Sequence, residues 1–168
     1  MKLLRTLGLA IALIGFSASA VAQTAPTGWK AATTAAKQWV ATSPDQGRGL
    51  TVKLIFYPVV QPAGALDLWF PEAHQRAAWE AGEIVNIGNI DSLGSTPESR
   101  LVAGTIAVKP KSGGRSSVLA YGYDTPHGRQ LVVIVLPSTL GRKNPAYKAA
   151  FAEMQSFWQA RKVYTPKP

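Results

Sequence analysis

The sequence contains no cysteine, and this absence removes several classes of site at once. Disulfides, thiol nucleophiles and thiolate metal ligands all require that side chain. A lipid-modified N-terminal cysteine is excluded for the same reason. We therefore expect a chain that depends on side-chain packing alone for its stability.

Acidic residues are scarce as well, with 9 Asp and Glu against 18 Lys and Arg. Without Lys2 and Arg5, which belong to the N-terminal segment described next, 16 basic and 9 acidic residues remain, a formal charge of +7. Such a surface attracts polyanions and acidic lipid headgroups. The charges are scattered along the chain, so they also suit a protein in which charge serves solubility alone.

Long apolar runs are missing everywhere except near the N-terminus. There Lys2 and Arg5 precede ten apolar residues, 7–16, and small residues follow up to position 22. This pattern predicts a secretory signal peptide over residues 1–22, cleaved before Gln23, and hence a periplasmic or secreted protein. Ten residues are too few to span a bilayer, so we expect a soluble mature chain without a transmembrane segment.

The most informative stretch is 116–161, which contains two apolar runs joined by a short linker and then a helical pattern. The linker, 124–128, includes Pro126 and Gly128 and predicts a hairpin loop. Residues 131–136 are apolar on both alternating faces, which indicates a central strand buried on both sides.

A helix is predicted directly after this hairpin. Asn144 suits the N-cap and Pro145 the first helical position. The apolar residues then recur with helical spacing, at Tyr147, Phe151, Met154 and Trp158. This amphipathic helix should cover one face of the sheet.

The first half of the chain predicts a second hairpin and a second helix. Residues 23–36 form an N-terminal leader, of which 29–36 could be helix or coil. A strand–turn–strand pattern extends from about 37 to 57, and Leu50, Val52, Leu54 and Phe56 alternate with a mixed face. A helix is predicted over 71–81, with Gly82 in the left-handed conformation at its end.

Two further strands are predicted before the central hairpin. Residues 83–90 form a short strand, and Asn89 is suited to begin a turn. The spacing of Ser95 and Glu98 suits one helical turn at most, because a strand pattern begins again at 100–108. Three consecutive strands would then form a meander.

These elements predict an α+β domain over residues 37–162 and a disordered tail over 163–168. Its antiparallel sheet, a hairpin plus a meander, is packed by a long C-terminal helix and a shorter middle helix. The element order over about 37–161, ending in a strand and the aromatic-bearing helix Tyr147–Trp158, resembles the sandwich of the PsbP-like proteins. That resemblance implies an extracytoplasmic accessory or binding module.

The chain has only two histidines as candidate catalytic bases, His74 and His127. His74 falls on the apolar row of its predicted helix, where a hydrogen-bonded core histidine is expected. His127 lies three residues after Asp124, which could orient its imidazole in a small hydrolase. Turn geometry alone also explains Asp124, and neither histidine has a metal-ligand spacing, so no metal site is predicted.

Two basic groups are candidates for ligand binding. Lys109, Lys111 and Arg115 surround one turn, and Arg142 and Lys143 precede the last helix. If both groups lie at one end of the sheet, they could hold a phosphate or a carboxylate near the helix N-terminus. Solvated turns often carry such residues without any ligand.

No nucleotide-binding glycine motif or serine-nucleophile motif occurs, so no cofactor is predicted. The sequence therefore predicts a non-catalytic accessory or binding protein that contacts an anionic polysaccharide, a lipid headgroup or an envelope protein. Nucleic acid is disfavoured, because aromatic and basic residues do not interleave. The alternatives are the hydrolase based on His127 and Asp124, and an enzyme inhibitor or immunity-type protein that uses loops 43–49 and 109–115.

Overall fold

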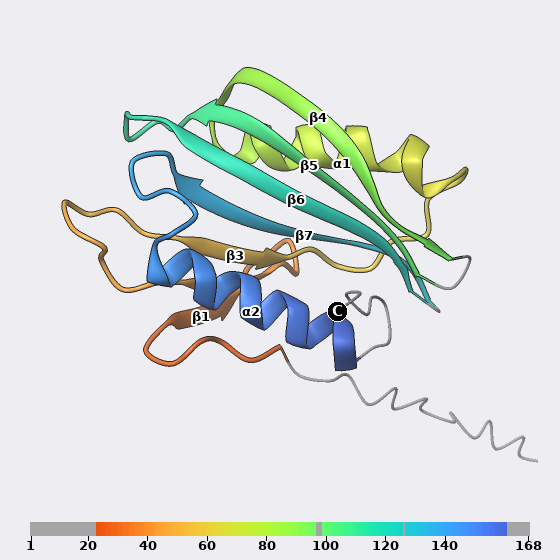
Figure 1. Cartoon of the computed structure of the whole chain (residues 1–168), viewed down its shortest axis with the longest axis horizontal. Helices are drawn as coiled ribbons and strands as arrows, with labels where there is room; N and C mark the ends of the chain where they lie inside the picture. Colours follow the sequence, from red (N-terminus) through yellow and green to blue (C-terminus); the bar gives the residue numbers. More distant parts are fainter. Residues whose placement is uncertain (1–22, 97–98, 126, 161–168) are drawn as a thin grey trace, which may run out of the picture.

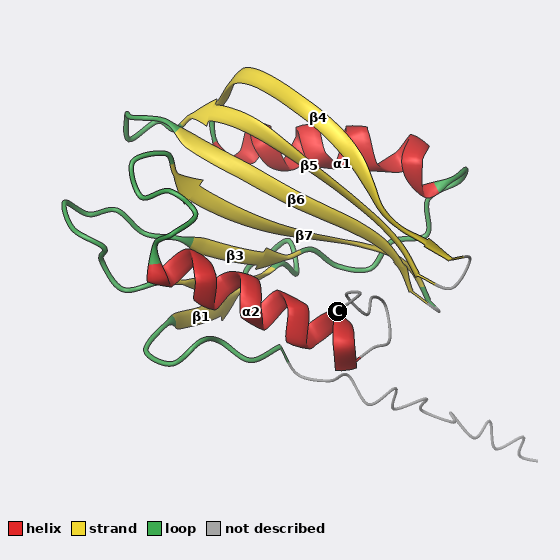
Figure 2. Ribbon diagram, viewed as in Figure 1, coloured by secondary structure: helices red, strands yellow, loops and turns green. Residues whose placement is uncertain are grey.

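The computed structural model describes residues 23–96, 99–125 and 127–160, and in this part of the chain seven strands form one antiparallel sheet with two helices (Figures 1 and 2). The strand order is β1-β2-β3-β7-β6-β5-β4. An α+β fold with an antiparallel sheet is therefore confirmed. The strands are β1 (Lys30–Thr33), β2 (Trp39–Thr42), β3 (Lys53–Phe56), β4 (Glu83–Thr96), β5 (Ser99–Lys109), β6 (Ser116–Thr125) and β7 (Gly128–Pro137), and the helices are α1 (Leu66–Ala81) and α2 (Pro145–Ala160).

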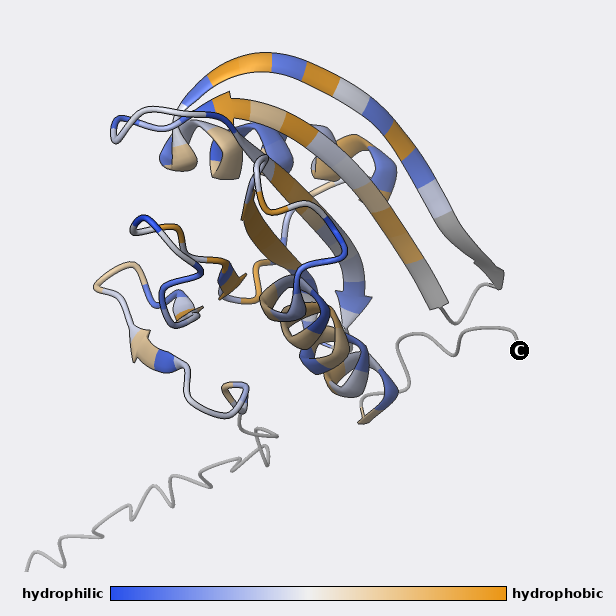
Figure 3. Cartoon of the chain, turned by 60° about the vertical axis from the view of Figure 1, so that its left-hand side comes forward, coloured by the Kyte–Doolittle hydropathy of each residue, from blue (hydrophilic) through white to orange (hydrophobic). Residues whose placement is uncertain are grey.

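Strand β7 lies at the centre of the sheet, between β3 and β6. Val132, Val133 and Ile134 are each fully buried although their side chains alternate between the two faces. The prediction of a strand covered on both sides is therefore confirmed. In Figure 3 the hydrophobic residues of β7 are coloured orange in the middle of the sheet.

The hairpin predicted from residue 37 is confirmed, because β2 and β3 pair antiparallel with Val40 opposite Ile55. The sheet nevertheless begins earlier in the chain. Residues 30–33, inside the segment taken as a leader, form β1 and pair with β2, with Ala32 opposite Val40. The prediction that residues 29–36 are helix or coil is therefore wrong, because this segment contains a strand.

Helix α1 begins at Leu66, five residues before the predicted start at Pro71. Pro71 lies inside the helix, where its missing N–H leaves only one backbone hydrogen bond unmade. The buried face contains Phe70, His74 and Ala78, as predicted.

The prediction for Gly82 is wrong: its φ of 162° is extended, not left-handed. A Cβ at this position would lie 2.5 Å from the Lys109 carbonyl oxygen, so close backbone contact with β5 explains the glycine.

Helix α2 begins as predicted, since the amide of Ala146 donates a 2.8 Å hydrogen bond to Oδ1 of the N-cap Asn144. Met154 and Trp158 are buried against the sheet. Both helices contain 16 residues, so the middle helix is not the shorter one. The middle helix was predicted to be shorter because Pro71 was taken as the first residue of α1, which in fact begins at Leu66.

Strand β4 is longer than the predicted strand 83–90 and extends to Thr96. Asn89 does not begin a turn. The pairing with β5 instead shifts register between Ile87 and Ile90, so the residues between them form a bulge and the strand continues. As the edge of the sheet, β4 exposes half of the Ile87 side chain.

The two helices lie on opposite faces of the sheet (Figure 1). On one face α1 packs on β5, β6 and β7, and on the other face α2 packs on the half that includes β3 and β7. Because α1 is displaced toward β4, it leaves its own face of β1, β2 and β3 uncovered. This offset produces the groove described below.

Four predictions lie wholly or partly outside the described residues: the signal peptide, the single helical turn suggested by Ser95 and Glu98, Pro126 of the hairpin loop, and the tail 163–168. Within the described segments, neither helix is long and apolar enough to cross a membrane.

Candidate functional site: a groove beside helix α1

The uncovered part of the sheet forms the floor of a groove of about 970 Å³. One side is the C-terminal half of α1, and the other boundaries are the loop 48–51 and the turn 110–115. Small-molecule sites commonly measure about 300–1,000 Å³. The groove is therefore large enough to hold a small ligand on the sheet.

The floor of the groove is apolar. Val40 on β2, Ile55 on β3 and Val135 on β7 all point to this face and all remain partly exposed. Val135 is informative, because residues 130–137 of β7 are otherwise buried. Ala77 and Ala81 of α1 add a wall of small side chains, which keeps the groove open.

The rim of the groove is strongly basic. Four exposed side chains line it: Lys30, Arg48, Lys53 and Arg115. None of the four forms an ion pair with a carboxylate among the described residues. Their charges are thus available to an anion that enters the groove.

Glu80 is the single acidic residue among the lining residues. Its Oε2 accepts a 2.7 Å hydrogen bond from the Tyr57 hydroxyl and a 3.0 Å bond from Gln38 Nε2. These bonds connect the last turn of α1 to the strand end at Tyr57 and to the loop before β2. They close one end of the groove with polar groups.

Burial raises the pKa of the Tyr57 hydroxyl well above its usual range, and the hydrogen bond and charge of Glu80 raise it further. Tyr57 is therefore a neutral hydrogen-bond donor at physiological pH and does not supply a phenolate.

The turn and loop that carry the predicted basic groups lie at the same end of the sheet, where the Ser138 amide donates a 2.9 Å bond to the Arg115 carbonyl. Arg115 lines the groove, and together with Lys109 it also lines an adjoining hollow of about 580 Å³. Lys111 is exposed in the same turn but outside both linings.

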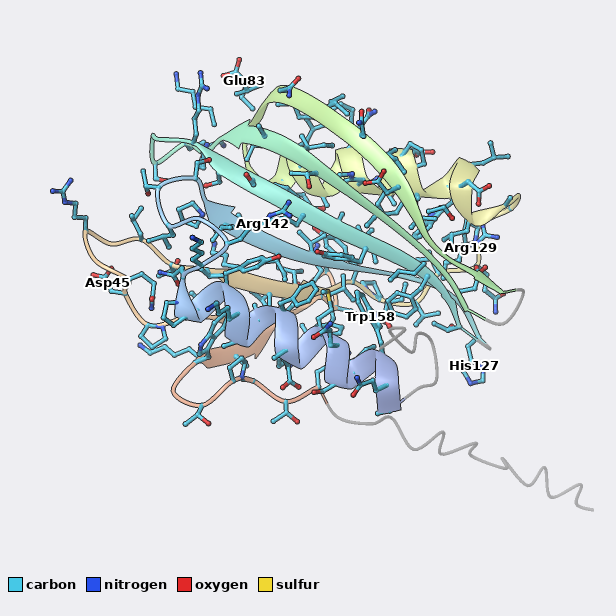
Figure 4. All side chains as sticks on the ribbon, viewed as in Figure 1. Asp45, Glu83, His127, Arg129, Arg142 and Trp158 are labelled. Carbon is cyan, nitrogen blue, oxygen red and sulfur yellow. The ribbon has the colours of Figure 1, made fainter. Side chains whose placement is uncertain are left out.

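Arg142, labelled in Figure 4, and Lys143 belong to the loop before α2. The charge of Arg142 acts on Tyr121, which packs in the core cluster that includes α2. The geometry therefore separates Arg142 from the groove, although both predicted groups lie at one end of the sheet.

The predicted pair His127 and Asp124 is arranged differently from a catalytic dyad. Asp124 Oδ1 accepts a 2.8 Å hydrogen bond from Arg129 Nε, which is on the neighbouring strand. His127 is exposed at the tip of the hairpin, and no hydrogen bond joins its side chain to Asp124 within the described residues. Figure 4 shows His127 at this tip, far from Arg142.

His74 is a core residue, as expected. Its side chain is 2% exposed, and Nε2 lies 3.1 Å from the Val118 carbonyl oxygen. Because a carbonyl only accepts, Nε2 carries the proton. Burial lowers the pKa of His74, and the bond to Val118 opposes that change.

The sequence did not predict Lys30, Lys53, Tyr57 or Glu80 as groove residues, and it included Arg48 only as part of the candidate loop 43–49. One signal was present: Lys53, Ile55 and Tyr57 alternate with the buried face of their strand. The sequence does not show which residues face this side of the strand, because that depends on where α1 crosses the sheet.

Comparison with known protein families finds no matching family, and comparison with curated proteins finds no match either.

Proposed function

We propose that this chain is an extracytoplasmic, non-catalytic binding protein that holds a small ligand with an anionic group and an apolar body in the groove. The observation that carries this proposal is the combination of a partly exposed apolar floor with four rim cations that form no ion pair with a carboxylate of the described segments. The N-terminal signal pattern and the resemblance to PsbP-like modules support the extracytoplasmic location.

Two forces would hold such a ligand. The apolar body covers Val40, Ile55 and Val135, and each square ångström of apolar surface removed from water contributes about 25 cal/mol. The anionic group lies near Lys30 and Lys53, where attraction is partly screened by solvent and salt. The ligand's apolar surface therefore determines most of the affinity, and the cations determine its charge preference.

Decanoate is a suitable probe, because it combines a carboxylate with a flexible apolar chain. Calorimetric titration of the mature chain should show saturable binding that weakens as the salt concentration rises. Lys53→Glu reverses a charge beside the floor and should weaken binding roughly tenfold, a change of about 1.4 kcal/mol.

Lys148→Glu is the matched control, since it makes the same charge change at an exposed position of α2, outside the groove lining. Its affinity for decanoate should stay close to that of the wild type. Equal losses in both variants would mean that only overall charge matters, and the absence of saturable binding would refute the proposed function.

A further inference from the structure

The strand register places the basic side chains of the groove at one end. Lys30 on β1 is opposite Thr42 on β2, and Thr42 is opposite Lys53 on β3. All three side chains therefore lie in one row across the uncovered face. Arg48 and Arg115 line the same groove from the adjoining loops.

The next row along the strands is apolar. Ala32 is opposite Val40, and Val40 is opposite Ile55, so these residues cross the same three strands one step further along. Each step of two residues advances about 7 Å along a strand. The apolar segment of a ligand can therefore lie on this second row, next to the basic row.

The third row is formed by the polar end of the groove, at Tyr57, Gln38 and Glu80. Both described hydrogen bonds of the Glu80 carboxylate go to Oε2, which leaves Oε1 as an acceptor without a described protein partner. No basic residue lies in the last turn of α1, so the partial negative charge of the helix C-terminus adds to that of Glu80. This end favours a cation or a hydrogen-bond donor.

We propose that the groove selects zwitterionic amphiphiles, which carry an anionic group at one end and an ammonium group at the other. The inference rests on the proposed function and specifies its ligand class. The anionic group lies in the Lys30–Lys53 row, the chain covers Val40 and Ile55, and the ammonium group donates to Glu80. Tyr57 is four positions after Lys53, which corresponds to about 13 Å along the strand.

Three probes of equal chain length test this selectivity: decanoate, ω-aminodecanoate and sebacate. They share the apolar chain and one carboxylate, and they differ in whether the far end is a methyl, an ammonium or a second carboxylate. Wild-type mature chain should bind ω-aminodecanoate about five- to tenfold more tightly than decanoate. Sebacate should bind no better than decanoate, because its second carboxylate meets Glu80.

Glu80→Gln removes the negative charge and keeps an oxygen that accepts from Tyr57. In this variant ω-aminodecanoate should bind no more tightly than decanoate. Glu72→Gln, which changes an exposed carboxylate on the outer face of the same helix, is the control and should keep the preference. Circular dichroism of each variant verifies that it is folded.

The outcomes separate the two proposals. If decanoate binds but ω-aminodecanoate binds no better in the wild type, the zwitterion inference is wrong and the proposed function stands. A preference that survives Glu80→Gln also overturns the inference, because another group must then recognise the ammonium. If none of the probes binds, both proposals are wrong.

Discussion

Gly122 lies on β6 beneath helix α1, and its replacement by alanine tests how that helix is seated. A Cβ at this position would lie 2.5 Å from Cδ2 of Phe70, 3.2 Å from Cε2 of Phe70 and 3.4 Å from Cζ3 of Trp69. Phe70 is completely buried, so its ring cannot swing into solvent. The helix or the ring must move by about 1 Å to restore a normal contact distance.

Overpacking of this kind typically costs about 1–3 kcal/mol. For a chain of this size, 1 kcal/mol lowers the melting temperature by roughly 3 °C, so Gly122→Ala should lower it by roughly 3–9 °C. Differential scanning calorimetry and urea unfolding of the mature chain measure the change. Ser117→Ala, on the opposite face of the same strand, is the control and should stay within about 0.5 kcal/mol of the wild type.

A second variant shows whether Phe70 is the cause. Phe70→Leu creates space next to position 122, so the double variant with Gly122→Ala should lose less stability than the two single variants added together. A coupling of about 1 kcal/mol is expected for residues in direct contact. A wild-type melting temperature for Gly122→Ala, or strict additivity of the two changes, would refute the described contact between α1 and β6.

Two titrating residues give predictions for the pH dependence of stability. Because the pKa of Tyr57 is raised on folding, the unfolded chain loses that proton first, and the free energy of unfolding should fall as pH rises above about 10. Tyr57→Phe removes the hydrogen bond to Glu80 and should be about 1 kcal/mol less stable at neutral pH. Its urea midpoint should also fall less steeply at alkaline pH than that of the wild type. Burial lowers the pKa of His74, so the unfolded chain binds a proton more readily and stability should fall as pH drops below about 6.5. In His74→Gln this acid-side slope should be reduced, and an unchanged slope would show that His74 does not cause it.

The elements predicted correctly are those whose pattern is local. Residues 131–136 are apolar on both faces, and such a run is buried wherever the chain places it, so β7 was identified from its own residues. The start of α2 was equally local, because Asn144 and Pro145 provide the cap and the first turn themselves. Packing then selected the predicted buried face.

The elements predicted less well depend on residues far away in the sequence. Ala31 and Ala32 have little strand propensity, and they become β1 because β2 offers an open edge to pair with. Gly82 looked like a helix terminator, yet the carbonyl of Lys109 on β5 is what requires a glycine there. Such close approaches cannot be recognised before the sheet order is known.

The groove was missed for the same reason. Lys53 and Tyr57 could be assigned to a mixed face of their strand, but Glu80 is more than 20 residues further along the chain. Only the position of α1 across the sheet brings Glu80 to the Tyr57 hydroxyl. The sequence did identify one groove residue, Arg115, because turns rich in glycine and cations are visible locally.

The most direct test of the proposed binding groove is an NMR titration of the isotopically labelled mature chain with decanoate. Saturable amide shifts should be concentrated at Val40, Ile55 and Val135 and in the turn 110–115. In Lys53→Glu they should require roughly tenfold more decanoate to reach half-saturation, whereas Lys148→Glu should titrate like the wild type. Shifts that avoid these strands, or that are concentrated on β4 and α2, would contradict the assignment of the groove as the binding site.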